Sequence, residues 1–425
     1  MRFKSLHEWL HWQETLHPKK IDLTLVRVRQ VLSAMRLLPP PYAVITVAGT
    51  NGKGSTVALL TAMLQAGGYK VGSYTSPHIL RYNERVAINS TPVDDDTLCR
   101  SFARIDAARG DVPLTYFEFG TVAAIDIFAD SAVDIAVLEV GLGGRLDATN
   151  AVDADVAVIA SVGIDHIAWL GDNREAIGVE KAGIFRSGRP AICGDPAPPT
   201  SVRQVAAEAG AQWQAINEHF GYRRQEAGWL WWSPGKQRGG LPLPALRGEV
   251  QLRNAATAIA ALETLAERFP LSQAHIREGL QKVTIAGRFQ VVTDVVTRIY
   301  DVAHNVDAAT ELANRLETMP WQGKTHAIFS MLGDKDIAGV VALLVKYVQH
   351  WHICEVESAR AAGLASLHGA LSLAGAGSIT AYDDAAAAWQ GVMAQAQPGE
   401  RVIIFGSFYL VSAVMPMDPL LGMTA

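Results

Sequence analysis

One lysine, Lys53, stands inside a glycine-rich turn whose residue types suit phosphate binding. The turn is the string Gly49-Thr-Asn-Gly-Lys-Gly-Ser55, which follows an apolar, β-branched run at 43–47 and precedes apolar residues at helical spacing. Glycines let backbone N–H groups turn onto phosphate oxygens, the start of a helix adds positive potential, and a lysine reaches the outer phosphates. The stretch therefore predicts a nucleotide-binding loop between a strand and a helix.

The string departs from the usual phosphate-loop pattern in two places. Val47 stands where that pattern has its first glycine, and Gly54 separates Lys53 from the hydroxyl of Ser55. A tight strand-to-helix turn that binds nothing would also require glycines. The lysine inside the turn, with a strand before it and a helix after it, favours the nucleotide site.

A second chemical feature is a lone carboxylate, Glu139, near the end of the apolar strand predicted at 133–140. Burying a carboxylate is costly unless it is paired or bound to a metal. The alternative to a metal is a salt bridge to Arg145. We favour magnesium, because that ion binds few protein oxygens together with phosphates and waters, and the strand end suits a metal beside the phosphate loop.

Two further polar residues follow predicted strands. Ser76 comes after a strand at 71–75, and His166 comes after a strand at 155–160. Taken alone, a Ser-Pro turn and a structural histidine are the ordinary interpretations. The carboxyl ends of parallel strands share one edge of a sheet, so Ser76, Glu139 and His166 are expected along one edge.

The elements of the first half predict helices and strands around these groups. Thr24 is a plausible N-cap for the second helix, and 79–88 is expected to form a mobile polar loop. Helices are also predicted after Asp172 or Asn173, with Lys181 near the end, and over 251–262. Four tryptophans suggest short antiparallel strands: Trp213, Trp229, Trp231 and Trp232.

The second half alternates strands and helices, which predicts a small doubly wound parallel sheet. The predicted strands are 297–303, 326–331, 351–356, 378–382 and 401–405. Polar clusters follow three of them, at Asp301–His304, Gly333–Asp336 and Gly406–Ser407, and should share one carboxyl edge facing the first domain. The domain boundary is placed near 294, which gives domains 1–293 and 294–425.

Composition limits the class of protein. A chain of 425 residues is long enough for two domains, and its 49% hydrophobic and 19% charged residues are ordinary for a globular protein. The net charge of -5, without a basic block, argues against nucleic acid as a partner. Three scattered cysteines support neither disulfides nor a zinc site and fit a reducing cytoplasm. No apolar run reaches the ~18 residues of a membrane helix.

Several strings together resemble the Mur ligase superfamily, in its folylpolyglutamate synthase and dihydrofolate synthase branch. Mur ligases themselves usually have Thr directly after the lysine, so Gly54 favours the folate branch. Val306 is a departure, because the family often has Pro there. The strings that carry the resemblance are Gly49–Ser55, Glu139–Asn150, Glu180–Phe185, Gly287–Gln290, Asp301–Asn305 and Asp334–Asp336.

The resemblance implies the fold and the activity. The fold is α/β: a P-loop-containing Mur-ligase-like ATPase domain, followed by a smaller Rossmann-like doubly wound α/β domain. The activity is an ATP- and magnesium-dependent ligase that forms an acyl phosphate. It adds L-glutamate to the carboxylate of dihydropteroate, giving dihydrofolate, and to the γ-carboxylate of reduced folates, giving polyglutamates.

Alternative functions stay open at this point. A monofunctional folylpolyglutamate synthase shares the fold and the chemistry, as does a Mur-type cell-wall ligase. A non-enzymatic P-loop nucleotide switch would usually carry an Asn-Lys-x-Asp motif, which we do not find. A nicotinamide dehydrogenase is suggested only by the topology of the second domain, which has no G-x-G-x-x-G loop after its first strand.

The resemblance also implies residue roles. Lys53, His304 and Lys181 are catalytic candidates, with Lys181 a candidate for carbamylation, and Lys335 is a candidate for binding glutamate. The nucleotide residues are Gly49, Thr50, Asn51, Gly52, Lys53, Gly54, Ser55, Asn254, Arg288 and Asp301. The metal ligands are Ser76, Glu139 and His166. The pterin and folate contacts are His17, Thr115, Tyr116, Phe117, Glu118, Leu146, Asp147 and Ala148. The cofactors are ATP, two Mg²⁺ ions and a monovalent cation, and the expected state is a cytoplasmic monomer without membrane or nucleic-acid partners.

Overall fold

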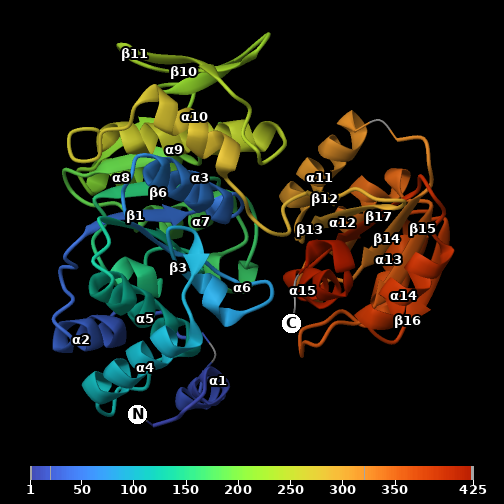
Figure 1. Cartoon of the computed structure of the whole chain (residues 1–425), viewed down its shortest axis with the longest axis horizontal. Coiled ribbons are helices and arrows are strands. Elements are labelled where there is room, and N and C mark those ends of the chain that lie inside the picture. Colours follow the sequence, from blue (N-terminus) through green and yellow to red (C-terminus); the bar gives the residue numbers. More distant parts are fainter. Residues whose placement is uncertain (1, 20, 320, 423–425) are drawn as a thin grey trace. The chain divides into compact units, whose positions relative to one another are not determined.

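The computed structural model describes residues 2–19, 21–319 and 321–422, which form two compact units (Figure 1). The first unit contains the residues up to His78 and Tyr82–Thr284. The second contains Ile79–Arg81 and the residues from Ile285 onward. The division lies before the boundary predicted at 293/294, because β12 (Gln290–Val292) pairs with the first parallel strand of the second unit.

The first unit is organised around an eight-stranded sheet with the strand order β4-β3-β2-β5-β1-β6-β7-β8. Neighbours are parallel from β2 to β8, and β3 and β4 add an antiparallel edge. All residues of β1 and β5 are buried, as expected for central parallel strands rich in β-branched residues. The strands are β1 (Ala43–Ala48), β2 (Val71–Tyr74), β3 (Val86–Ile88), β4 (Thr91–Pro92), β5 (Ile135–Glu139), β6 (Val156–Ile159), β7 (Pro190–Cys193) and β8 (Gln212–Ala215).

Helices surround this sheet. The helix that follows the phosphate loop, α3, packs against α9 and α10. The helices α1, α4 and α5 share an aromatic core in which Phe102 contacts Trp9 and Phe119. The helices are α1 (Leu6–Leu16), α2 (Val26–Ala34), α3 (Lys53–Ala66), α4 (Asp95–Arg109), α5 (Tyr116–Asp130), α6 (Ile167–Leu170), α7 (Arg174–Ala182), α8 (Thr200–Glu208), α9 (Glu249–Thr264) and α10 (Gln273–Lys282), with 3₁₀ turns η1 (Tyr82–Arg85) and η2 (Ala148–Ala151).

A small antiparallel sheet joins β9 (Gly221–Gln225), β10 (Gly228–Ser233) and β11 (Lys236–Leu241). Three of the tryptophans predicted to lie in short antiparallel strands, Trp229, Trp231 and Trp232, lie in β10. The prediction is wrong for Trp213, which lies in β8 and pairs parallel to β7 in the main sheet. A four-residue edge strand has the same alternation whichever way its neighbour runs.

Two other local predictions are wrong. The second helix begins at Val26, and its N-cap is Leu25 rather than Thr24, whose hydroxyl accepts from Val26 N at 3.3 Å. Of the stretch predicted as a mobile loop at 79–88, residues 82–88 instead form η1 and β3. Tyr82 is buried there because its ring packs against Phe102, a contact that the neighbouring polar residues conceal in the sequence.

The second unit contains a six-stranded sheet with the order β12-β13-β17-β14-β15-β16, parallel except for β12. One core, with Phe329 and Trp351, lies under α11, α12 and α13, and the other, with Ile328 and Ile404, lies under α14 and α15. The predicted doubly wound sheet is confirmed. The elements are β13 (Thr297–Asp301), α11 (Val306–Thr318), β14 (Thr325–Phe329), α12 (Ile337–Leu344), η3 (Val345–Tyr347), β15 (His350–Cys354), α13 (Leu364–Leu373), β16 (Ser378–Tyr382), α14 (Ala385–Gln395), β17 (Arg401–Phe405), α15 (Phe408–Val414), η4 (Met415–Met417) and η5 (Pro419–Leu421).

Among the described helices, none has both the length and the apolar character needed to cross a bilayer.

Candidate active site

Four neighbouring strands of the first unit, β2, β5, β1 and β6, end at the same edge of the sheet. Ser76 follows β2, Glu139 is the last residue of β5, the phosphate loop follows β1, and His166 follows β6. The register pairs Val47 of β1 with Glu139, so the carboxylate lies beside the strand that feeds the loop. The sheet thus brings the predicted phosphate and metal groups to one edge.

The phosphate loop takes a conformation that requires glycine at position 52. Gly52 has φ of 83°, in the left-handed region that other residues rarely adopt. A Cβ there would lie 2.9 Å from Oδ1 of Asn254, which shows that this amide of α9 lies against the loop. The predicted nucleotide residues Gly49–Ser55 and Asn254 are therefore neighbours.

Hydrogen bonds fasten the loop to the segment that leads to His166. Thr50 N donates to Ser161 O at 2.9 Å, and Asn51 N donates to Ser161 Oγ at 3.0 Å. The Thr50 hydroxyl donates to the carbonyl of Gly163 at 3.0 Å. Ser161 and Gly163 were not predicted from the sequence, because backbone pairing between two loops leaves no mark in residue type.

Lys53 is the first residue of α3 and lies over the loop. Its Nζ donates to the carbonyls of Gly49 at 3.0 Å and Thr50 at 3.2 Å. The helix N-terminus and the ammonium group therefore share one small region, which favours an anion.

Glu139 and Ser76 also meet. Ser76 N donates to Oε2 of Glu139 at 3.2 Å, and the glutamate is buried. Arg145, the alternative partner considered for Glu139, instead pairs with Glu180 at 2.8 Å. The buried carboxylate at the strand end, the serine hydroxyl and the exposed imidazole of His166 are chemically suited to a hard divalent cation beside phosphates.

Lys181, near the end of α7, is almost completely buried. Its pKa is lowered to about 7, mainly by burial and also by the charge of Lys53, while Asp165 and Asp147 act in the opposite direction. Because Lys181 interacts electrostatically with Lys53 and Asp165, it lies near the phosphate loop and near the residue before His166. A large fraction of Lys181 is therefore neutral near pH 7, the form in which an amine is a nucleophile.

A chain of charged groups links His17 to the start of α5. Arg27 donates to both carboxylate oxygens of Glu118, at 2.9 and 3.1 Å, and to Asp22 at 2.7 Å. Asp22 lies 3.7 Å from Nε2 of His17. Glu118 Oε2 also accepts from Thr115 N at 2.7 Å, in a capping box. Arg27 and Asp22 were not predicted, and the only signal for them was that a buried glutamate requires a cation.

Tyr116 and Phe117, the two aromatic residues that follow Thr115, contact different parts of the first unit. The guanidinium of Arg85 lies 5.6 Å from the ring centroid of Tyr116, and burial raises the pKa of Tyr116 to about 12. A Cβ at Gly141 would lie 2.5 Å from Phe117 Cζ, so that ring packs on the segment after Glu139. Phe117 therefore borders the sheet edge at which Glu139 lies.

The carboxylate of Asp147 organises its own turn. It accepts from Leu142 N at 2.9 Å, from Thr149 N at 3.0 Å and from the Thr149 hydroxyl at 2.7 Å. Burial raises its pKa. Leu146 is half-buried and Ala148 is buried in the core beside α5. The structure thus gives Asp147 a positioning role within the turn.

In the second unit, the nucleotide candidates gather at the end of β13. Asp301 accepts from Phe289 N at 2.9 Å and from Ala303 N at 2.8 Å, and removal from water raises its pKa, opposed by Arg315 and Arg288. The guanidinium of Arg288 lies 5.0 Å from the ring centroid of Phe408.

His304 and Lys335 belong to the same sheet edge, because β13, β17 and β14 are neighbours. The ring of His304 lies 6.0 Å from that of Phe408, and its Nδ1 contacts the carbonyl of Val302 at 2.9 Å. Since a carbonyl only accepts, Nδ1 carries the proton and Nε2 is the basic nitrogen. Lys335 is half-exposed after β14.

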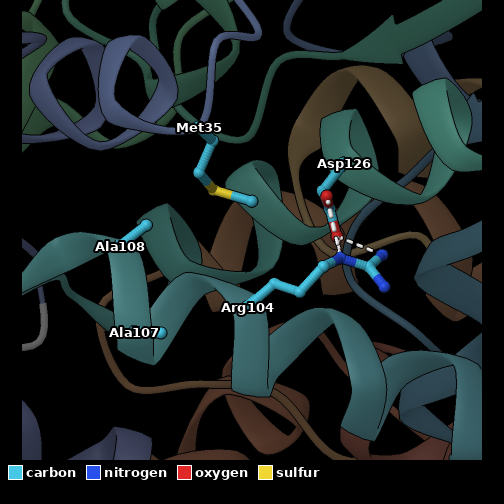
Figure 2. Close-up of a pocket in the computed structure, with 5 residues that line it drawn as sticks. All are labelled: Met35, Arg104, Ala107, Ala108 and Asp126. Atoms are coloured by element: carbon cyan, nitrogen blue, oxygen red, sulfur yellow. Dashed lines mark hydrogen bonds and ion pairs between the residues drawn. The ribbon is translucent and has the colours of Figure 1, made fainter.

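A surface pocket of about 420 Å³ lies elsewhere in the first unit (Figure 2). Its walls come from α4, α5 and the end of α2, and its charged pair is Arg104 and Asp126, 2.6 Å apart. None of its five lining residues is among the predicted site residues. We assign no function to this open depression.

Comparison with known families decides the relationship. The model of the Mur ligase middle domain matches residues 47–262, and that of the Mur ligase glutamate ligase domain matches residues 287–408. The chain belongs to the Mur ligase family. Within it, the chain belongs to the dihydrofolate synthase/folylpolyglutamate synthase group of ATP-dependent ligases.

Curated relatives of this group match almost the whole chain. The dihydrofolate synthase/folylpolyglutamate synthase of Escherichia coli K12 is 44% identical over 410 residues, which cover 96% of this chain and 94% of the relative. A protein of Lacticaseibacillus casei named folylpolyglutamate synthase is 33% identical and covers 91% of this chain and 93% of its own.

Solved structures of proteins in this group superpose closely on the chain. Escherichia coli FolC in complex with DHPP and ADP superposes with a TM-score of 0.93 at 43% identity, covering 99% of each chain. The bifunctional folylpolyglutamate synthase/dihydrofolate synthase of Yersinia pestis, in complex with AMPPNP and a Mn ion, has a TM-score of 0.90 at 46% identity. That match covers 97% of this chain and 98% of the other.

Proposed function

We propose that this Mur-family ligase joins L-glutamate to the carboxylate of dihydropteroate and to the γ-carboxylate of reduced folates. The observation that carries the proposal is the edge of the first sheet, where the phosphate loop stands beside the buried Glu139, 3.2 Å from Ser76 N. The similarity of the chain to bifunctional relatives over nearly its full length supports both reactions.

The phosphate loop would bind the triphosphate of ATP. Lys53 would reach the γ-phosphate from the start of α3, and Asn254 would contact the adenine from α9. Arg288 and Asp301 of the second unit are proposed as further nucleotide contacts. In a low-dielectric site, a fixed cation and helix N–H groups stabilise the charge that develops during phosphoryl transfer.

Ser76, Glu139 and His166 would hold divalent cations at this edge. We propose magnesium, with two ions, because the donors include oxygens and the site lies beside phosphates. Bound there, the cation neutralises phosphate charge. A monovalent cation, a monomeric state, the lack of a nucleic-acid partner and a cytoplasmic location stay predictions.

Lys181 is proposed to carry a carbamate. Its neutral amine would attack carbon dioxide, forming an N–C bond and releasing one proton, so that a buried cation becomes an anion. The lowered pKa near 7 supports the required neutral amine. A ¹³C resonance from labelled bicarbonate, absent in Lys181→Arg, is the expected signature. A resonance that persists in that variant would contradict the proposal.

The pterin ring would lie against α5. Tyr116 and Phe117 offer aromatic surface, and Glu118, oriented by Arg27, offers an acceptor for the ring's donors. Thr115 and His17 contact the same group of charged side chains, Thr115 through Glu118 and His17 through Asp22. Leu146, Asp147 and Ala148 would border the ring from the turn after Glu139.

The reaction would run in two steps. The substrate carboxylate attacks the γ-phosphorus of ATP, which gives an acyl phosphate and releases ADP. The amine of glutamate then attacks the acyl carbon, and phosphate leaves. His304 would accept a proton from the glutamate ammonium at Nε2, and Lys335 would pair with a glutamate carboxylate.

The test is ADP release with ATP, magnesium and L-glutamate, measured with dihydropteroate and separately with a reduced folate. We expect activity on both. Activity on reduced folate alone would favour the monofunctional folylpolyglutamate synthase instead. A folded, ATP-binding protein that is silent on both would contradict the folate function and favour a cell-wall precursor.

A further inference from the structure

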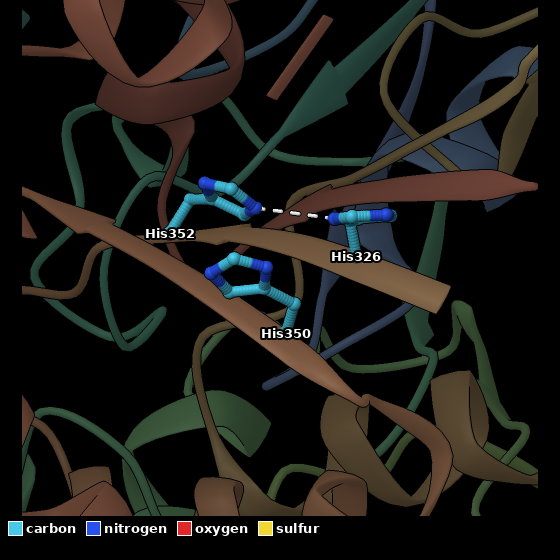
Figure 3. A group of neighbouring side chains, drawn as sticks. All are labelled: His326, His350 and His352. Atoms are coloured by element: carbon cyan, nitrogen blue, oxygen red, sulfur yellow. Dashed lines mark hydrogen bonds between the residues drawn. The ribbon is translucent and has the colours of Figure 1, made fainter. Parts of the chain in front are cut away.

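Three histidines gather on the sheet of the second unit: His326 on β14, and His350 and His352 on β15 (Figure 3). One ring nitrogen from each can be chosen so that all three lie within 4.8 Å of one another. The register pairs His326 with His350, and the period of two along β15 puts His352 on the same face. The strands themselves therefore position the three rings.

The cluster is separate from the candidate active site. His350 is the first residue of β15 and His326 the second of β14, so the rings lie toward the amino ends of these strands. Asp301 is the last residue of β13, and His304 and Gly333–Asp336 follow the carboxyl ends of parallel strands in the same sheet. The mechanism proposed above uses none of the three histidines.

Each ring is oriented through one nitrogen by an oxygen partner. Such outer partners fix the tautomer of a metal-binding histidine and increase its basicity. A carboxylate on the distal nitrogen, as on His326, is the strongest form of this arrangement. The contacts are His326 Nε2 with Glu400 Oε2 at 3.1 Å, His350 Nε2 with the Thr380 hydroxyl at 2.9 Å, and His352 Nδ1 with the Tyr382 hydroxyl at 3.0 Å.

The nitrogens that remain are Nδ1 of His326, Nδ1 of His350 and Nε2 of His352. The first and last are 3.2 Å apart and share a hydrogen bond, which a bound ion would replace (Figure 3). Zinc–nitrogen bonds of about 2.0–2.1 Å in a tetrahedron put two ligand nitrogens about 3.3–3.4 Å apart. The His326–His352 pair already has this spacing, and the third ring offers a nitrogen within 4.8 Å of the others.

Burial supports the same chemistry. His326 and His352 are buried, and His350 is partly exposed, which gives an ion a route from solvent. The neutral imidazole is the form that binds metals.

We propose that His326, His350 and His352 bind one divalent transition-metal ion of the zinc class, with water as a fourth ligand. Three imidazoles suit zinc, whereas magnesium prefers oxygens. The ion would join β14 to β15 and, through Glu400, the residue that precedes β17. It therefore stabilises the second unit at the end of the sheet away from the nucleotide candidates.

The test is zinc binding to the full chain, stripped with a chelator and titrated in excess magnesium with a competing chromophoric chelator. We expect one zinc per chain. Glu400→Gln should weaken binding about 10–100-fold, as removal of an outer partner does. His350→Gln, which removes a ligand from a partly exposed position, should weaken it more. His368→Gln, at an exposed histidine of α13, is the matched control and should bind as the original chain does.

Thermal unfolding without metal checks that each variant is folded. Added zinc should raise the melting temperature of the original chain and His368→Gln equally, that of Glu400→Gln less, and that of His350→Gln least. Equal zinc affinity in His350→Gln and the original chain would overturn the proposal. So would the absence of tight binding in the original chain. Zinc that is lost in Glu139→Gln but kept in His350→Gln would place the ion at the candidate active site and equally overturn it.

Discussion

At the scale of single residues, Lys53 carries a charge on a long side chain, while its backbone is held as the first residue of α3. Its Nζ lies within 3.2 Å of two carbonyls of the loop that it closes. The string around it indicated this arrangement, because lysine and glycine each have a local reason to be there. Arg27 had no such signal: its partner Glu118 lies 91 positions away in the sequence.

Lys53→Ala is expected to lower the rate of ADP release by about 100- to 1,000-fold, the usual effect of removing one preorganised group that stabilises transition-state charge. The melting temperature should stay within a degree or two, since the hydrogen bonds of the side chain to Gly49 and Thr50 are made to loop carbonyls. Lys282→Ala, at an exposed helix position, is the control and should keep full activity. Near-normal turnover in Lys53→Ala would refute the phosphate-loop assignment.

Glu139→Gln removes the charge of the buried strand-end carboxylate while keeping its shape. The magnesium concentration for half-maximal ADP release should rise at least ~10-fold, because hard cations prefer carboxylate to amide oxygen. Titration of the rate with magnesium measures this, with Glu226→Gln in the exposed turn before β10 as the control. An unchanged magnesium dependence would exclude Glu139 as a ligand.

Lys181 makes stability depend on pH. Its folded pKa near 7 lies below the unfolded value of 10.5, so the unfolded chain binds more protons between these values and stability rises with pH there. In carbon-dioxide-free buffer, this group should contribute ~1.4 kcal/mol per pH unit above pH 7. The cost of a buried charge is fully present below pH 7.

Denaturant unfolding of the original chain and Lys181→Met at several pH values measures the difference. We expect Lys181→Met to be the more stable variant at pH 7, and its advantage to shrink as the pH rises toward 10. An advantage that does not change with pH would show that Lys181 keeps an ordinary pKa in the folded chain.

At the scale of elements, the strand–loop–helix unit β1–α3 follows directly from its sequence, since apolar β-branched residues, glycines and helical spacing each specify their part. The ends of β2, β5 and β6 were predicted in the same way. The contacts that bring them together were not, because the bonds of Thr50 and Asn51 to Ser161 join loops 110 positions apart. The turn at 79–88 was mispredicted since its buried aromatic stands among charged neighbours.

Gly52→Ala should damage the loop more than the helix that follows it. The left-handed conformation costs a side chain about 1–2 kcal/mol, and the new methyl group would also meet Asn254, 2.9 Å away. We expect ATP affinity, measured by calorimetry, to fall at least ~10-fold.

Gly68→Ala is the matched control, because Gly68 has a similar φ of 87° with open space around it. Gly68→Ala should lose stability through backbone strain alone, Gly52→Ala should lose at least as much, and only Gly52→Ala should lose ATP affinity. Equal ATP affinity in both would show that the loop at Gly52 does not bind the nucleotide.

At the scale of the whole molecule, the alternation of strands and helices was enough to predict two α/β sheets. Strand order was not predictable: β5 lies between β2 and β1, although it follows both in the chain. The assignment of Ile79–Arg81 to the second unit was equally unpredictable, since the other buried members of the core that Ile79 joins begin at Val296. Strand order and the assignment of Ile79–Arg81 depend on packing between residues far apart in the sequence, which local sequence patterns do not show.

The central claim is that a carboxylate of the substrate is activated by ATP before glutamate attacks it. The most direct measurement uses dihydropteroate labelled with ¹⁸O in its carboxylate, together with ATP, magnesium and L-glutamate. Activation as an acyl phosphate predicts that each turnover yields dihydrofolate and one phosphate that carries an ¹⁸O atom, detected by mass spectrometry. Dihydrofolate accompanied by unlabelled phosphate, or no dihydrofolate from an ATP-binding enzyme, would contradict the claim.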